Sequence, residues 1–331
     1  MLFTEVDGVE LRDPSGGAIT GETNFGSFFA PDSYTISIAD FDGINGFTLT
    51  GQDITVTKTE LTTNPVHKVN VLEVEGNTIG YLHYTGFTNE FDNDLNAAFA
   101  ELQNAGVTDL VLDLRYNGGG SVETANDLST MITGQFEGEV FITQEFNAER
   151  NEDAMSTRFF NNNLGSGDDG PSINSLGLER LFVLTTERTA SSSELILSGL
   201  DPYIDIIQIG ESTSGKFEGS FLLYDSSNFA RANANPNHRY VMLPLTFRSI
   251  NAEGLTDYFD GFAPDIELIE SPFTYGTLGE QGEPLLDAAI NAIINGRSNI
   301  GNYNTIKYPS LYDTEQKNPL FDRMMSEPVA F

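Results

Sequence analysis

Two short polar segments of the chain contain the residue types needed for covalent catalysis. Residues 189–194 read Thr-Ala-Ser-Ser-Ser-Glu, residues 210–216 read Gly-Glu-Ser-Thr-Ser-Gly-Lys, and Lys216 follows Ser191 by 25 positions. A serine hydroxyl is a weak nucleophile until a base accepts its proton, and an uncharged lysine amine can be that base. The pairing predicts a serine hydrolase in which Ser191 attacks the substrate and Lys216 takes the proton.

Other nucleophiles and bases have less support in the sequence. The chain has no cysteine, which excludes a thiol nucleophile, disulfides and zinc–thiolate sites. Its three histidines, His67, His83 and His238, stand outside any serine-hydrolase signature. We interpret His83 as a strand residue and His238 as a loop residue, and we expect no metal and no cofactor.

A third segment could stabilise a negatively charged oxygen during the reaction. Residues 113–120 read Asp-Leu-Arg-Tyr-Asn-Gly-Gly-Gly and follow an apolar stretch. We expect Ser191 in the first turn of a helix, where the amide of Ser192 is unpaired and can donate to an oxyanion. Gly119 or Gly120 would provide the second donor, because a glycine lets the backbone approach a substrate closely.

Together the three segments resemble peptidase family S41, the C-terminal processing or tail-specific proteases. Members look like T/S-A-S-x-S-E at the nucleophile and G-x-x-T-x-G-K at the base, with D-L-R-x-N-x-G-G upstream. The resemblance covers roughly residues 66–290, and Gly-Tyr-Leu-x-Tyr-x-x-Phe at residues 80–87 is similar to S41 proteins of marine and gut Bacteroidetes. It implies an α/β fold of the crotonase/ClpP type with a mostly parallel sheet. It also implies cleavage of peptide bonds near C-termini through an acyl-enzyme.

The resemblance separates the reacting residues from those that support them. It makes Ser191 the nucleophile, rather than Ser192 or Ser193. Members often have a glutamine four residues after the lysine, where this chain has the shorter Ser220. The residues expected to support the site without reacting are Glu194, Ser220, Asp113 and Arg115.

Lys216 must be uncharged to act as a base. Burial of the amine favours the neutral form, whereas the net charge of −33 favours the ammonium. Salt screens charges that lie more than about 8–10 Å apart at ordinary ionic strength. We therefore expect local burial to outweigh the charge of the whole chain.

Three alternative functions remain open. Residues 210–216 also fit a nucleotide-binding G-x-x-x-x-G-K loop, but Phe217 stands where such a loop needs Ser or Thr to bind magnesium. Nucleotide binding is therefore the weakest of the three. A carboxylesterase could use the same Ser–Lys dyad and oxyanion hole. A peptide-binding module without catalysis would fit the departure at Ser220.

The strongly acidic composition limits the partners. Of 331 residues, 49 are Asp or Glu and 16 are Lys or Arg. This argues against nucleic acid and anionic membranes, because binding to either requires cationic side chains. No apolar run approaches the roughly 18 residues of a membrane span, and residues 1–20 lack the plan of a signal peptide. We expect peptide or protein C-terminal segments as partners, and the resemblance implies a periplasmic or cell-surface location.

Sequence patterns divide the chain into three parts. Residues 1–65 read as short strands that look like part of a PDZ domain, and we expect its front half, with the carboxylate-gripping loop, to be missing. Residues 66–295 form the S41-like catalytic region, and residues 296–331 form a tail without periodicity. In the first part, residues 47–50 and 54–57 flank Gly-Gln-Asp and predict a hairpin.

Strand and helix patterns alternate in the catalytic region, which predicts an α/β fold. Ser191 follows one predicted strand and Lys216 follows another. The expected strands are residues 69–74, 78–84, 110–114, 181–185 and 204–209, and the expected helices are residues 92–105, 121–132 and 191–200.

Overall fold

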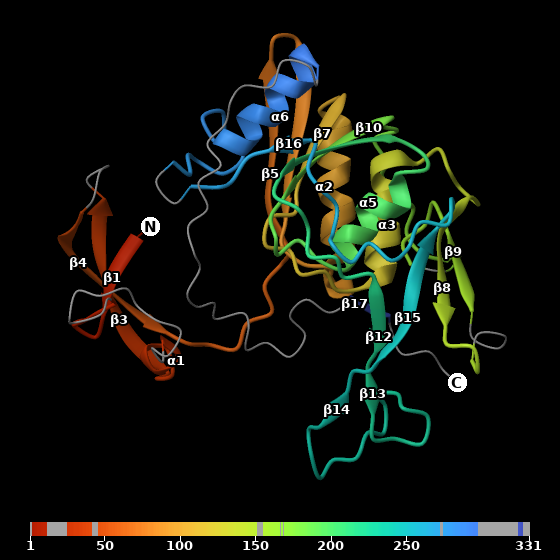
Figure 1. The fold of residues 1–331 in the computed structure, drawn as a ribbon, viewed down its shortest axis with the longest axis horizontal. Helices are drawn as coiled ribbons and strands as arrows, with labels where there is room; N and C mark the ends of the chain where they lie inside the picture. The colour runs from red at the N-terminus through yellow and green to blue at the C-terminus, as the bar shows by residue number, and fades with distance from the viewer. Residues whose placement is uncertain are drawn as a thin grey trace. The chain divides into compact units, whose positions relative to one another are not determined.

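Figure 1 shows the fold in a computed structural model of the chain. The structure describes residues 2–11, 25–41, 46–150, 155–165, 167, 169–271, 274–296 and 324–326. The chain forms two compact units, one made mainly of residues 1–63 and the other mainly of residues 64–270 and 274–306. Most of the predicted tail lies outside the described residues.

The first unit is a four-stranded antiparallel sheet in the order β2-β1-β3-β4. The hairpin predicted within residues 47–57 is wrong, because a single strand runs through Gly51. Gly51 has φ +80° and lies where the pairing of β3 with β4 shifts register, so this glycine marks a bulge and not a turn. The elements are β1 (Leu2–Val6), β2 (Val9–Glu10), α1 (Phe25–Phe28), β3 (Ser33–Phe41) and β4 (Phe47–Thr57).

The second unit is built on a six-stranded sheet in the order β16-β11-β10-β7-β6-β5. All neighbouring strands are parallel except β5 and β6, so the predicted mostly parallel α/β sheet is confirmed. The strands are β5 (Val66–Val74), β6 (Asn77–Tyr84), β7 (Asp109–Asp113), β10 (Arg180–Thr185), β11 (Asp205–Gly210) and β16 (Ile266–Glu267).

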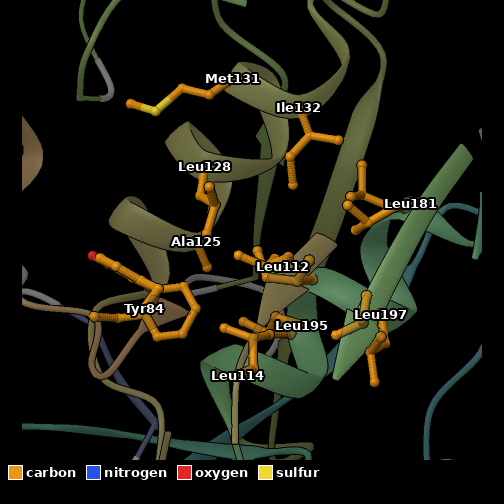
Figure 2. Packing of buried hydrophobic residues seen from close by; sticks show 14 of the residues in the cluster. Tyr84, Leu112, Leu114, Ala125, Leu128, Met131, Ile132, Leu181, Leu195 and Leu197 are labelled. Carbon is orange, nitrogen blue, oxygen red and sulfur yellow. The ribbon is translucent and has the colours of Figure 1, made fainter. Parts of the chain in front are cut away.

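Helices cover both faces of this sheet because its strands are apolar on both sides. On β7, Leu110 and Leu112 belong to the core shared with α2, α3 and α5, whereas Val111 belongs to the core shared with α6. Figure 2 shows Leu112 packed among the side chains of α3 and α5. The helical elements are η1 (Asn89–Phe91), α2 (Asp92–Asn104), α3 (Val122–Thr133), α5 (Ser192–Leu200) and α6 (Pro284–Asn295), of which α6 was not predicted.

A second sheet adjoins this core in the order β17-β12-β15-β8-β9. A short hairpin, β13 paired with β14, continues from β12 (Figure 1). Among the described helices, none has both the length and the apolar character needed to cross a bilayer. The strands are β8 (Val140–Phe146), β9 (Ser156–Phe159), β12 (Glu218–Phe221), β13 (Leu223–Tyr224), β14 (Val241–Met242), β15 (Leu245–Asn251) and β17 (Met324–Ser326).

A buried carboxylate on α3 makes the stability of this unit depend on pH. Asp127 is 1% exposed, and its Oδ2 accepts the Gly165 amide at 3.0 Å. Burial raises the pKa of Asp127 to about 8, and the nearby Glu123 and Asp92 carboxylates add to this rise. An unfolded aspartate loses its proton near pH 4. Between about pH 4 and 8 the folded state therefore binds more protons than the unfolded state, and stability falls as pH rises.

Asp127→Asn should remove this pH dependence, because the amide does not titrate. We expect the free energy of unfolding of the unmodified protein to fall between pH 5 and 8 by at most about 1.4 kcal/mol per pH unit from this group. The variant should show a flatter profile in urea unfolding. Asp94→Asn, a change at an exposed carboxylate of α2, is the control. Equal slopes for the two variants would contradict the assignment.

Candidate active site

The three segments identified from the sequence meet at the carboxyl ends of three adjacent parallel strands, β7, β10 and β11. The Ala190 amide donates to the Asn117 carbonyl at 3.0 Å, and the Ser214 amide donates to the Thr189 carbonyl at 3.0 Å. The loop after β10 is thus bonded to the loops on either side of it. Ligand sites of α/β folds form at this edge of the sheet.

Ser191 precedes the first residue of α5 in a strained backbone conformation. Its φ is +63° and its ψ is −116°, which few residues with a side chain adopt. Such strain costs about 1–3 kcal/mol and gathers at functional sites. The side chain is completely buried, and no described residue hydrogen-bonds to its Oγ. The hydroxyl is therefore held in a fixed place and is not used by the fold.

The two serines that follow are used by the fold. The Ser192 hydroxyl donates to the Gly120 carbonyl at 2.8 Å, and the Ser193 hydroxyl donates to the Asn117 carbonyl at 3.0 Å. Both bonds tie the start of α5 to the glycine-rich loop after β7. This difference between Ser191 and its neighbours agrees with the choice of Ser191 as nucleophile.

Glu194 joins the serine segment to the lysine segment. Its Oε2 accepts the backbone amides of Ser191 and Lys216, each at 2.8 Å. Its Oε1 accepts the Thr213 hydroxyl and the Gly215 amide, each at 2.6 Å. Burial raises the pKa of Glu194 and these four donors oppose the rise. Only the ionised carboxylate can accept from all four at once.

The glycine loop lies directly against Ser191. A Cβ on Gly119 would lie 2.7 Å from the Cβ of Ser191 and 2.8 Å from the Ser192 nitrogen, so only glycine fits. The Gly119 amide donates to Oδ1 of Asn117 at 2.9 Å. The structure therefore brings Gly119 to the predicted nucleophile, with its own amide engaged by a neighbouring side chain. Gly120 meets the site through its carbonyl, which faces Ser192.

The Lys216 side chain is held by a carboxylate that the sequence analysis did not single out. Its amine donates to Oε2 of Glu218 at 2.9 Å, and the lysine side chain is 15% exposed. In this structure no hydrogen bond joins the amine to Ser191 or to Ser220, whose buried hydroxyl has no partner among the described residues. The backbones of the predicted pair are brought together, but the dyad itself stays a prediction.

Asp113 and Arg115, two of the residues expected to support the site, form an ion pair at the end of β7. The guanidinium Nη2 lies 2.6 Å from Oδ2 of Asp113, and Nη1 lies 2.7 Å from Glu270 and 3.0 Å from Glu283. Burial pushes the pKa of Asp113 upward, but the charge and hydrogen bonds of Arg115 outweigh it and hold that pKa below its ordinary value. The sequence analysis missed both glutamates, which lie more than a hundred residues downstream.

The known proteins that are similar to this chain are peptidases. The model of peptidase family S41 matches residues 78–232, a range that contains Ser191 and Lys216. The carboxyl-terminal-processing protease of Picosynechococcus sp. is 24% identical over 246 residues, which cover 74% of this chain and 52% of that protein. The chloroplastic carboxyl-terminal-processing peptidase 1 of Arabidopsis thaliana is 30% identical over 139 residues, which cover 42% of this chain and 25% of that protein.

The matched region spans about half the length of the first of these relatives and a quarter of the second. Among solved structures, a candidate S41 protease from Bacteroides fragilis superimposes with a TM-score of 0.70 at 25% identity. That match covers 88% of this chain and 72% of the other. The similarity therefore extends over most of the described fold.

Glu194→Gln should destabilise the protein and disorder the loop that carries Lys216. A glutamine keeps the shape, but its Nε2 is a donor and would face two of the four donors that the carboxylate accepts. Leaving buried donors unpaired costs about 1–3 kcal/mol each, so we expect a loss of about 2–6 kcal/mol in urea unfolding. Glu101→Gln, at an exposed position of α2, should change stability by less than about 0.5 kcal/mol. A loss no larger than this control's would contradict the bridging role.

Proposed function

We propose that this chain is a serine peptidase of family S41 and that it acts through a Ser191–Lys216 dyad. Its substrates are the flexible C-terminal parts of proteins or peptides. The main support is the Ser191 hydroxyl, which is fixed in a strained turn and left unbonded, while Glu194 holds the backbone of Lys216 beside it. A periplasmic or cell-surface location follows from the family resemblance and stays a prediction.

The reaction begins when Ser191 Oγ attacks the carbonyl carbon of the scissile peptide bond and its proton passes to the neutral Lys216 amine. The resulting oxyanion accepts hydrogen bonds from the Ser192 amide and from the amide of Gly119 or Gly120. The lysine ammonium then returns the proton to the leaving amine, and an acyl-enzyme remains. Water, deprotonated by the same lysine, releases the acid and restores Ser191.

One hydrogen bond of the resting structure must change for this sequence of steps, and a second must change if Gly119 is the second oxyanion donor. The Lys216 amine has to leave Glu218, and in that case the Gly119 amide has to leave Asn117. The Glu218 carboxylate attracts the Lys216 amine across 2.9 Å. Glu218 and Ser191 thus compete for the Lys216 amine. A bound substrate has to favour the contact of the amine with Ser191 over its contact with Glu218.

Ser191→Ala should abolish hydrolysis of an unstructured peptide, because no other hydroxyl at this turn is free to attack. Ser193→Ala, which removes only the bond to the Asn117 carbonyl, should keep substantial activity. The rates are measured with a fluorogenic peptide and with a matched ester. An inactive Ser193→Ala with an active Ser191→Ala would contradict the assignment. Turnover of the ester alone would favour a carboxylesterase.

Glu218→Gln should raise kcat/KM for the peptide, because the Lys216 amine no longer has to leave a negatively charged partner at 2.9 Å before it accepts the Ser191 proton. We expect a gain of no more than about fivefold, since a partly exposed ion pair contributes about 0–1 kcal/mol. The rates are measured with the fluorogenic peptide at one fixed pH. Glu253→Gln makes the same change of charge at an exposed position and should leave kcat/KM unchanged. A loss of activity in Glu218→Gln would mean that its carboxylate supports the base and does not compete for it.

A further inference from the structure

The strand that follows Lys216 has one edge covered by a distant part of the chain. β12 begins two residues after Lys216 and pairs on one side with β15 in antiparallel fashion. On its other side β12 pairs in parallel with β17. The register places Met324 opposite Gly219, Met325 opposite Ser220, and Ser326 opposite Phe221. Three residues from near the end of the sequence thus extend the sheet beside the predicted base.

The same three residues also lie beside α3. That helix begins directly after the turn that contains Gly119 and Gly120. β17 therefore contacts both the strand that follows the lysine and the helix that follows the glycine turn. A peptide stretched along β12 in this position would pair with the strand that begins two residues after Lys216.

β17 is poorly suited to be a permanent part of the sheet. It is three residues long and stands at the edge of its sheet, where β12 is its neighbour. Parallel pairing is slightly weaker per residue than antiparallel pairing, and such short strands are marginally stable by themselves. Backbone pairing at an edge is also the contact by which many proteins bind extended peptides, because it tolerates different side chains.

We propose that the outer edge of β12 is the docking site for an extended peptide substrate, and that Met324–Ser326 occupies this edge in cis. Incoming peptides must displace this segment before cleavage. The inference rests on the proposed function in that the ligand is a peptide substrate. A segment of the same chain is present at an effective concentration on the order of millimolar, so it competes even when its pairing is weak.

The test compares Met325→Pro with Met325→Ala in the full chain. Proline has no amide hydrogen to donate to a neighbouring strand, and its ring fixes φ at about −65°, whereas a parallel strand has φ of about −120°. Alanine changes the same side chain and keeps the backbone donor and the freedom to extend. We expect Met325→Pro to lower KM for an unstructured fluorogenic peptide at least fivefold with kcat unchanged. Met325→Ala should behave like the unmodified protein.

A binding measurement keeps this inference separate from the peptidase activity. In a Ser191→Ala background, a fluorescent peptide with the sequence of residues 320–331 should bind the Met325→Pro variant at least fivefold more tightly than the Met325→Ala variant. The same peptide with proline in place of its second methionine should bind neither variant at that affinity. If no variant hydrolyses peptides, the proposed function fails while this binding result still decides the docking site.

Two results would overturn the docking site. One is equal peptide affinity for the two Ser191→Ala variants. The other is a melting temperature of Met325→Pro far below that of Met325→Ala with loss of the folded state, because Met324–Ser326 would then be needed to close the sheet.

Discussion

The Glu194 carboxylate is the interaction on which the rest of the site depends. It is completely buried, and its two oxygens accept four hydrogen bonds from residues on both sides of the site. A buried charge is costly unless its hydrogen-bonding capacity is filled. Three of the four donors come from the loop after β11, so this loop must pack against the start of α5. That closure brings the backbone of Lys216 next to that of Ser191 in every folded molecule.

A second buried charge network holds the other side of the site. Arg115 is paired with Asp113, Glu270 and Glu283, which ties the end of β7 to the segment before α6. The loop that follows carries Tyr116 at φ +64° and the glycines that face Ser191. Strained backbone persists only where its surroundings determine it fully. The ion pairs of Arg115 hold the start of this loop, and the hydrogen bonds from the Ser192 and Ser193 hydroxyls hold its carbonyl groups.

The sequence predicts those features that depend on neighbouring residues. All five predicted strands and three predicted helices of the catalytic region are present, with ends shifted by a few residues, because hydrophobic periodicity is a local property. The position of Glu194 followed from its motif. Glu270, Glu283 and β17 could not be predicted, since their partners are distant in sequence and no local pattern marks them. Glu218 was missed for another reason: a carboxylate two residues from a lysine on an extended segment looks like a surface charge.

The pairing of Lys216 with Glu218 is compatible with catalysis because it is weak. The two side chains are 15% and 34% exposed, so water screens the pair. Partly exposed ion pairs of this kind contribute about 0–1 kcal/mol. Enzymes lower reaction barriers by at least about 8 kcal/mol. The free energy needed to break this ion pair is small beside that reduction. A substrate that covers the site removes water from around the amine, and such desolvation disfavours the ammonium form of a lysine. The resting ion pair therefore orders the Lys216 side chain, but it is weak enough for the amine to leave Glu218 when a peptide binds.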